Sequence, residues 1–321
     1  MRAVVTEAYG APPVLRDVPE PKPGLGELLV RVRASSLNAF DLAVAGGLAK
    51  GMMEHRFPVI LGRDFAGTVE GLGEGAEHFA AGDAVFGVVA KTVLADGGFA
   101  ELVTVPEATG VARIPRGMDA VQAGALGVAG LAALASVAAI EPRAGAVEPK
   151  AGATVLIAGA TGGVGSFATQ LAARRGLHVI ATARPGEAAG FVRDLGASEV
   201  VDYAADVGAQ VRALRPGGVD AVLHFAGDGM ALADLLVPGG RLASTLGLGQ
   251  DQFAGRDLTA VAVMDEPAEV ALNGLAAVVV QGLLRVPITR TYTLDEVPRA
   301  FGEFAGTLGK AAVVIVLSDD L

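Results

Sequence analysis

The chain of 321 residues contains no cysteine, which excludes disulfide bridges, thiol nucleophiles and zinc sites built on cysteine. It has only four histidines, and these lack the spacing of metal ligands: His55, His78, His178 and His224. Positive charge is also scarce, because the formal net charge is −10 and no run of lysines or arginines occurs. A nucleic acid is therefore not an expected partner, since its binding depends on neutralising phosphates. No metal is expected either.

The sequence also lacks a segment typical of a secreted or membrane-spanning protein. Its first ten residues, MRAVVTEAYG, include no apolar signal region. The apolar run VAGLAALASVAAI (128–140) is rich in Ala and Gly and is followed by Glu141-Pro142. It is shorter than the roughly 18 to 20 apolar residues that a bilayer requires. We expect this run to form a buried helix, and we expect a cytoplasmic protein without a membrane partner.

The pattern of apolar residues and turns changes near residue 150. Before residue 125, short apolar runs alternate with turns rich in Gly, Pro and Asp, which is typical of a compact barrel-like β domain. After residue 150, apolar strands alternate with helices of about ten residues, which predicts a parallel, doubly wound α/β sheet. The chain closes with a helix in 293–306 and a strand in 310–317.

A glycine-rich turn, GATGGVG (159–165), follows a predicted strand and precedes a predicted helix (163–175). Its Ala160-x-Gly162-x-x-Gly165 spacing is the dinucleotide-binding fingerprint with Ala in the first place. Gly162 lets the backbone approach a pyrophosphate, Gly165 lets the helix pack on the strand, and the helix N-terminus attracts the anion. No Gly-Lys-Ser/Thr follows, so a P-loop is excluded. The predicted contacts from this turn are Ala160, Thr161, Gly162, Gly163, Val164 and Gly165.

The next predicted strand indicates which dinucleotide binds. NAD enzymes usually place a carboxylate about 20 residues after the turn. Here the segment ATARPGE (181–187) carries Arg184 at the strand end, and its acid, Glu187, comes three residues later. A guanidinium group suits a 2′-phosphate because its planar fork donates charge-assisted hydrogen bonds. Arg184, with Thr182 beside it, therefore predicts NADPH; the alternative is a solvated arginine at a strand end.

Several segments together resemble the medium-chain dehydrogenase/reductase superfamily, and within it the zinc-free quinone oxidoreductase and enoyl reductase branch. In chain order they are SLNAFDLAVAGG (36–47), FPVILGRDFAGTVEGLGEGAEHFAAGDAVFG (57–87), GGFAELVTVP (97–106), VLIAGATGGVGSFATQLA (155–172), LGASEVVDY (195–203) and LGKAAVVIV (308–316). The resemblance covers almost the full chain. It implies an α/β protein with a GroES-like, β-barrel-type catalytic domain (1–125 and 286–321) and a Rossmann NADP-binding domain with a doubly wound parallel sheet (126–285).

The resemblance also implies a reaction without zinc. Zinc members carry Cys where Asn38 stands, and Gly-His-Glu where Gly62-Arg63-Asp64 stands. Hydride transfer without a Lewis acid needs an electrophilic acceptor, such as a quinone or an α,β-unsaturated carbonyl compound. The implied activity is that of an NADPH:quinone reductase or enoyl reductase-like enzyme acting on a small molecule.

By the same resemblance, Asn38 and Asp41 are the candidate catalytic residues and lie near the nicotinamide. Asn38 would donate a hydrogen bond or hold its loop. Asp41 would relay a proton, and the alternative is that it only holds a helix start. Further implied cofactor contacts are Tyr203, Ala226, Gly227, Leu246, Gly247 and Lys310. The alternatives are a core position for Tyr203 and a surface position for Lys310. His224 is expected to be a satisfied strand histidine.

Two other functions stay open. Many relatives have Leu-Thr-Ala-Tyr where this chain has LAAL (131–134), which leaves room for an NADPH-binding protein of low turnover with a structural or regulatory role. A zinc-free secondary alcohol dehydrogenase is the other alternative. Relatives are commonly homodimers paired through an edge strand, and by analogy AVAVMDE (260–266) is the candidate here.

Overall fold

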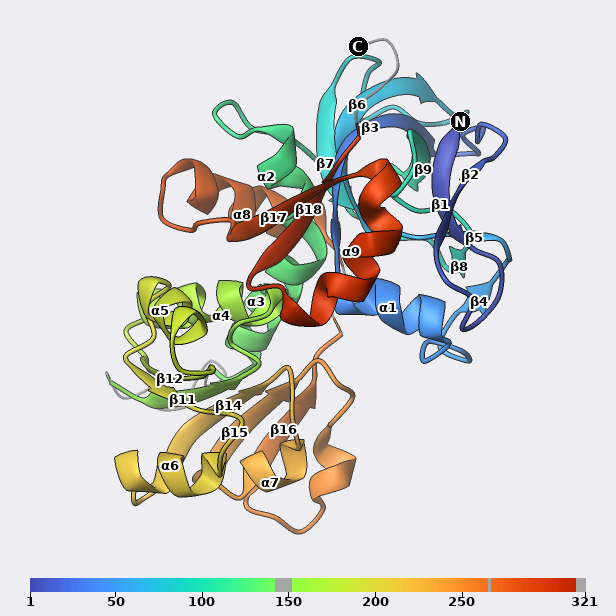
Figure 1. Cartoon of the computed structure of the whole chain (residues 1–321). Coiled ribbons are helices and arrows are strands. Elements are labelled where there is room, and N and C mark those ends of the chain that lie inside the picture. Colours follow the sequence, from blue (N-terminus) through green and yellow to red (C-terminus); the bar gives the residue numbers. More distant parts are fainter. Residues whose placement is uncertain (142–151, 265–266, 316–321) are drawn as a thin grey trace. The chain divides into compact units, whose positions relative to one another are not determined.

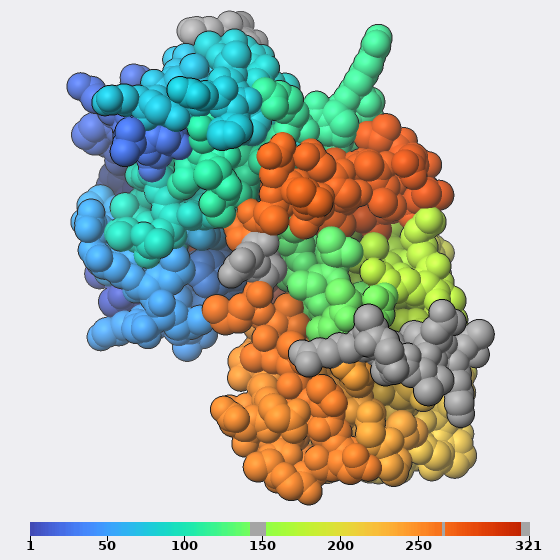
Figure 2. Space-filling model, turned by 180° about the vertical axis from the view of Figure 1, so that it is seen from behind, coloured from blue at the N-terminus to red at the C-terminus, as the bar shows by residue number. Residues whose placement is uncertain are grey.

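The computed structural model describes residues 1–141, 152–264 and 267–315 (Figure 1). The chain divides into two compact units, one of Met1–Leu131 with Glu266–Leu321 and the other of Ala132–Asp265. This division differs from the predicted domain boundaries, because helix α8 (Glu269–Val280) packs against strand β10 (Val111–Arg113). Figure 2 shows α8 at the surface, beside the segment around β10.

The first unit is built on a mostly antiparallel sheet in the order β10-β7-β6-β3-β18-β17, with β9 also paired to β3. Its longest strand, β3, alternates half-buried and buried residues and then becomes continuously buried, as expected for a strand that enters a core. The strands of the unit are β1 (Arg2–Thr6), β2 (Val14–Asp17), β3 (Glu27–Leu37), β4 (Glu54–His55), β5 (Val59–Ile60), β6 (Asp64–Leu72), β7 (Ala84–Val88), β8 (Val93–Leu94), β9 (Leu102–Pro106), β10, β17 (Ile288–Thr293) and β18 (Lys310–Val314).

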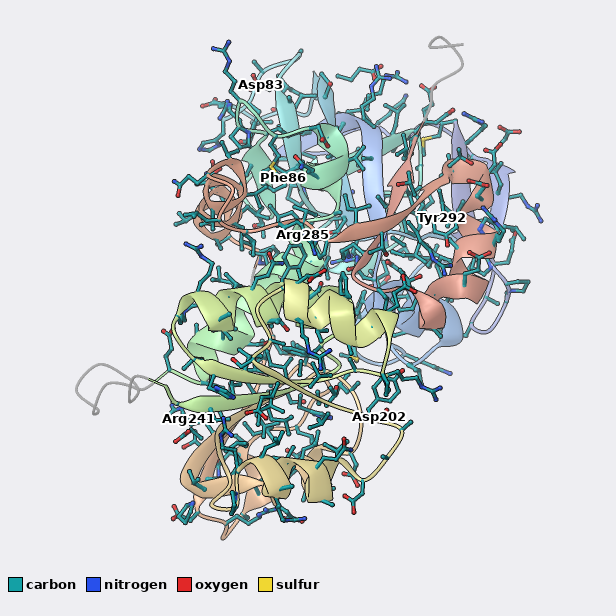
Figure 3. The ribbon with its side chains drawn as sticks, turned by 60° about the vertical axis from the view of Figure 1, so that its left-hand side comes forward. Asp83, Phe86, Asp202, Arg241, Arg285 and Tyr292 are labelled. Carbon is teal, nitrogen blue, oxygen red and sulfur yellow. The ribbon has the colours of Figure 1, made fainter. Side chains whose placement is uncertain are left out.

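The pairing of β18 with β3 joins two segments that are far apart in the sequence. The strands are antiparallel, with Ala311 opposite Leu37, so the start of β18 lies beside the end of β3. Tyr292 on β17, labelled in Figure 3, is buried, and its hydroxyl donates to Glu303 Oε2 at 2.7 Å. The helices of the first unit are α1 (Ala39–Gly46), α2 (Ala120–Gly124), α8, α9 (Val297–Glu303), and the 3₁₀ turns η2 (Leu294–Glu296) and η3 (Phe304–Gly306).

The second unit contains the predicted parallel sheet, with six strands in the order β13-β12-β11-β14-β15-β16. Helices α4 and α5 cover one face, and α6 and α7 cover the other (Figure 1). Strand β11 is buried at every residue, which explains its continuous apolar sequence. The elements are β11 (Thr154–Ala158), α4 (Gly163–Arg174), β12 (His178–Thr182), α5 (Glu187–Asp194), β13 (Glu199–Val201), α6 (Val207–Leu214), β14 (Val219–His224), α7 (Gly229–Ala233), β15 (Leu236–Ser244), η1 (Gln250–Phe253) and β16 (Leu258–Ala262).

The structure places two further segments that were singled out in the sequence. The apolar run 128–140 forms helix α3 (Gly127–Ala139), and no helix in the described part of the chain is long and apolar enough to cross a membrane. The predicted edge segment 260–266 overlaps β16, which does lie at the edge of the parallel sheet. Residues 265 and 266 of that segment lie outside the described residues.

Candidate active site

The glycine-rich turn joins β11 to α4 at the carboxyl end of the parallel sheet. Gly159 has a left-handed φ of +83°, and α4 begins at Gly163 with Gly162 as its N-cap residue. A Cβ atom at Gly165 would lie 2.1 Å from the carbonyl oxygen of Gly159. Only glycine therefore allows α4 to approach the turn this closely, which is the packing role predicted for Gly165.

The amino end of α4 fits an anionic group. A Cβ atom at Gly162 would meet only the carbonyl oxygen of Gly159 among the described residues, at 3.5 Å, an ordinary contact distance. The packing of the chain does not itself require glycine at this position. Because Gly162 has no side chain that could cap α4, the first N–H groups and the helix dipole favour an anion such as a pyrophosphate.

The other predicted residues near this turn have different surroundings. Ala160 is buried, whereas Thr161 and Val164 are half-buried. Thr182, at the end of β12, is buried, and its Oγ1 accepts a hydrogen bond from the N–H of Gly159 at 3.0 Å. Thr182 therefore fastens the turn to the neighbouring strand.

Arg184 and Tyr203 lie together beyond the carboxyl ends of β12 and β13. The guanidinium carbon of Arg184 is 5.7 Å from the centroid of the Tyr203 ring. Arg184 is exposed, and the Tyr203 side chain is 51% exposed, so Tyr203 is not a core residue. A guanidinium group beside an accessible aromatic face can bind a phosphate and a neighbouring planar ring at once.

The turns after β14 and β15 are tied together by a buried histidine. His224 Nδ1 is 2.9 Å from Ser244 Oγ, and its Nε2 is 3.1 Å from the carbonyl oxygen of Gly227. Ser244 Oγ also accepts the N–H of Leu246 at 3.0 Å. His224 is thus the satisfied strand histidine that was expected, whereas the part played by Ser244 was not predicted. Gly227 and Gly247 have left-handed φ values of +85° and +82°, which favour glycine.

In the first unit, Asn38 and Asp41 form the start of α1. Asn38 is the N-cap residue, and its backbone N–H donates to Asp41 Oδ2 at 2.8 Å. Both side chains are buried. Asp41 therefore holds the helix start, as the alternative interpretation of this residue expected; whether it also carries a proton stays a prediction.

A buried polar network continues from Asn38 to two residues that are distant in sequence. The Nζ of Lys310 donates to Asn38 Oδ1 at 2.6 Å and lies 3.6 Å from Asp64 Oδ2. Asn38 Nδ2 donates to the same Asp64 oxygen at 2.8 Å, and the hydroxyl of Ser36 donates to it as well. Lys310 is only 1% exposed, so the surface position considered for it is wrong. A role for Asp64 was not predicted.

Burial has the largest effect on the pKa values of Asp41 and Lys310. It raises the pKa of Asp41 to about 7; the Asp64 carboxyl adds to the rise, while the charges of Lys310 and Arg63 and the hydrogen bond from Asn38 oppose it. Burial also lowers the pKa of Lys310, although the nearby Asp64 and Asp41 carboxyls favour its charged form.

The raised pKa of Asp41 predicts a pH-dependent stability. Because its folded-state pKa of about 7 exceeds the ordinary 3.8, the stabilising contribution is complete below pH 3.8 and is lost as the pH rises through about 7. Compared with Asp41→Asn, the wild type should lose free energy of unfolding as the pH rises from about 4 to about 7. Urea titrations over this pH range measure the difference.

The matched control for that experiment is Asp119→Asn, which replaces an exposed carboxylate that caps α2 by accepting the N–H of Gln122 at 2.7 Å. Its pH profile should parallel that of the wild type. Parallel profiles for the wild type and Asp41→Asn would contradict the prediction.

Comparison with known proteins identifies the family. Residues 24–116 match the model of the alcohol dehydrogenase GroES-like domain, and residues 163–262 match the model described as zinc-binding dehydrogenase. The chain is 30% identical to the quinone oxidoreductase of Sus scrofa over 338 residues, which cover 99% of this chain and 98% of that protein. The chain belongs to the quinone oxidoreductase branch of the medium-chain dehydrogenase/reductase superfamily.

Other members of this superfamily extend the comparison. The chloroplast envelope quinone oxidoreductase homolog of Arabidopsis thaliana is 38% identical over 213 residues, 65% of this chain, and the matched part spans 62% of that relative's length. The structure of the Coxiella burnetii quinone oxidoreductase has a TM-score of 0.85 and 27% identity, with 98% of this chain and 99% of that chain covered. A mycobacterial structure complexed with NADPH has a TM-score of 0.82 and 26% identity, covering 98% and 100%.

Proteins of this superfamily bind nicotinamide cofactors, as the mycobacterial neighbour complexed with NADPH illustrates. The glycine turn, the Arg184–Tyr203 pair and the turns after β14 and β15 all lie at the carboxyl edge of one parallel sheet. In open α/β sheets, ligands bind at that edge, where the strand order reverses. Here the reversal falls between β11 and β14, and the glycine turn after β11 and the turn after β14 flank that point.

Proposed function

We propose that this protein is an NADPH-dependent oxidoreductase that transfers hydride to a quinone or to an α,β-unsaturated carbonyl compound. The observation that carries the proposal is the exposed Arg184–Tyr203 pair. It lies on the same sheet edge as the uncapped amino end of α4. The relatives named quinone oxidoreductase and the NADPH complex of the mycobacterial neighbour support it.

Bound NADPH would supply the hydride. Gly162 and the first N–H groups of α4 would bind its pyrophosphate, Arg184 its 2′-phosphate, and Tyr203 would pack against the adenosine. The other proposed residues shape the turns at this edge: Ala160, Thr161, Gly163, Val164, Gly165, Thr182, Ala226, Gly227, Leu246 and Gly247.

We also propose that the reaction needs no metal ion. The side chains at the positions of the zinc ligands do not fit one, because Asn38 Oδ1 already accepts from the ammonium group of Lys310. Both oxygens of Asp64 also accept hydrogen bonds within the chain, one from the N–H of Val128 at 2.7 Å. Across residues 1–141, 152–264 and 267–315, no group of three or more His, Cys, Asp or Glu side chains could hold a metal ion.

An acceptor that needs no Lewis acid must already be electrophilic. Hydride addition to a quinone, or to the β-carbon of an enone, produces an oxyanion that takes up one proton and is stabilised by hydrogen-bond donors. We propose that Asn38 and Asp41 serve this end of the reaction by fixing the start of α1. We further propose a homodimer that pairs through the edge strand β16.

The function is tested by following NADPH oxidation with a panel of benzoquinones, naphthoquinones and 2-enones, and NADP⁺ reduction with secondary alcohols. Turnover is expected with at least one quinone or enone and not with the alcohols. Addition of EDTA should leave the rate unchanged, because no step depends on a metal; loss of activity that zinc restores would contradict the metal-free mechanism.

The second candidate is an NADPH-binding protein of low turnover. It is favoured by LAAL at 131–134, which lacks the hydroxyl group and the aromatic ring of many relatives. If NADPH binds and no acceptor of the panel is reduced, the enzyme proposal fails and this candidate stands.

A further inference from the structure

Lys310 is a charged side chain in the interior of the first unit. Its side chain is 1% exposed. Its ammonium group donates to Asn38 Oδ1 at 2.6 Å and to the carbonyl oxygen of Leu37 at 3.2 Å, and lies 3.6 Å from Asp64 Oδ2. Removing an ammonium group from water costs several kcal/mol unless partners replace its hydration. These three oxygens are such partners, and two of them belong to the segment that opens α1.

The Asn38 amide is held from both ends by opposite charges. Its oxygen faces the ammonium group of Lys310, while its Nδ2 donates to Asp64 Oδ2 at 2.8 Å and to the carbonyl oxygen of Ser36 at 3.2 Å. A reversed amide would set an NH₂ group against an ammonium and an oxygen against a carboxylate. Both amide hydrogens of Asn38 are therefore used within the chain, which leaves neither for a direct hydrogen bond to an acceptor.

Asp64 joins this arrangement to a second helix. Its Oδ1 accepts the N–H of Val128 at 2.7 Å, in the first turn of α3, while its Oδ2 accepts from Ser36 and Asn38. Asp64 is fully buried. One carboxylate thus fixes the starts of α1 and α3 relative to each other within the first unit.

We propose that Lys310 is a positioning residue for hydride transfer that acts through Asn38. Lys310, Asn38 and Asp64 form a charge-locked triad that fixes the start of α1. Two of its members, Asn38 and Asp64, stand where zinc members place metal ligands. The cation that holds this segment is then the ammonium group of Lys310 and not a metal ion. The inference rests on the proposed function, and it replaces the earlier expectation that Lys310 touches the cofactor.

The first test removes the charge of Lys310 but keeps its length, with Lys310→Met. The Kd of NADPH, measured by fluorescence, should stay within about twofold, because on this proposal Lys310 acts through Asn38 and not on the cofactor. The kcat/KM for 1,4-naphthoquinone should fall on the order of 10²-fold, as expected when a positioning group is lost. A large rise in the Kd of NADPH with an unchanged kcat would instead show a direct cofactor contact and overturn the proposal.

Lys91→Met is the matched control. Lys91 lies in the same unit, is mostly buried, and pairs with Asp96 at 2.6 Å and Glu27 at 3.0 Å outside the triad. This variant should leave kcat/KM within about twofold of the wild type even if it lowers stability. An equal loss of kcat/KM in Lys91→Met and Lys310→Met would show that general destabilisation explains both, and would count against the triad.

A charge exchange tests the triad even if Lys310→Met does not fold. Asn38→Asp places two carboxylates side by side, and Asp64→Asn places two amides there and removes the anion near Lys310. The double variant restores one carboxylate, one amide and one ammonium group. Its free energy of unfolding and its kcat/KM should both be closer to the wild type than those of either single variant. Additive losses would contradict the proposal.

The two proposals fail in different ways. If the wild type reduces no acceptor, the proposed function fails, whereas the triad is still judged by the coupling of the two substitutions in unfolding. If the wild type turns over and the double variant shows no coupling, the triad fails and the enzyme proposal stands.

Discussion

Replacement of Arg184 by alanine is expected to raise the Kd of NADPH by roughly 10- to 100-fold, since hydrogen bonds to a charged group contribute about 1.5 to 3 kcal/mol. The Kd of NADH should change little, because NADH lacks the 2′-phosphate. Arg184 is exposed and lies against the ring of Tyr203, so its loss removes a phosphate ligand without opening the core. Fluorescence titration with each cofactor measures the two constants.

The control for this variant is Arg193→Ala, which removes an exposed arginine from α5 in the same unit. It should leave both constants unchanged. Lysine at position 184 should restore part of the NADPH affinity, because it keeps the charge but not the planar fork. Equal effects of Arg184→Ala on NADPH and NADH would refute its role at the 2′-phosphate.

Alanine substitutions at the two glycines of the turn, Gly162 and Gly165, should affect stability and NADPH binding differently. In Gly165→Ala the new methyl group would lie 2.1 Å from the carbonyl oxygen of Gly159, so the turn must shift and both stability and NADPH binding should fall. In Gly162→Ala the methyl group meets the chain only at 3.5 Å, so the fold should persist. It would, however, occupy the space of the pyrophosphate, and NADPH affinity should fall by about tenfold or more.

Melting temperature and NADPH titration together separate these effects. Gly190→Ala is a suitable control, since Gly190 lies within α5 and a Cβ atom there would meet no described atom within 4 Å. That variant should be as stable as the wild type or slightly more so, because alanine favours the helix. If Gly162→Ala proves as unstable as Gly165→Ala, a methyl group at position 162 must clash with the chain, which would contradict this prediction.

The local features of the fold were predictable because they leave local signals. The glycine turn shows its strand, its spacing and its helix within 25 residues of sequence. The parallel sheet also follows from short patterns. Residue Arg184 was singled out by the missing carboxylate, although its contact with Tyr203 depends on the neighbouring positions of β12 and β13 and could not be read from either segment alone.

The polar network was not predictable in this way. Lys310 contacts Asn38 across 272 residues, and Asp64 contacts Asn38 across 26, so both contacts depend on strand register in the first unit. One signal was present in the sequence. Lys310 stands at the start of a strand whose other residues are apolar, and strands of that composition are usually buried. The position of α8 was missed for a similar reason, since its packing on β10 joins segments that no local pattern connects.

The pairing of β18 with β3 has a consequence for biosynthesis. The second unit, Ala132–Asp265, is continuous in sequence, so all of its strands have left the ribosome while the last segment of the first unit is still being made. Strand β3 meanwhile lacks the neighbour that covers its end, and Asp64 and Asn38 lack their cation. Because domains generally fold as units during synthesis, we expect the dinucleotide sheet to be complete first. The first unit, although it begins the chain, is then the last part of the protein to complete its fold.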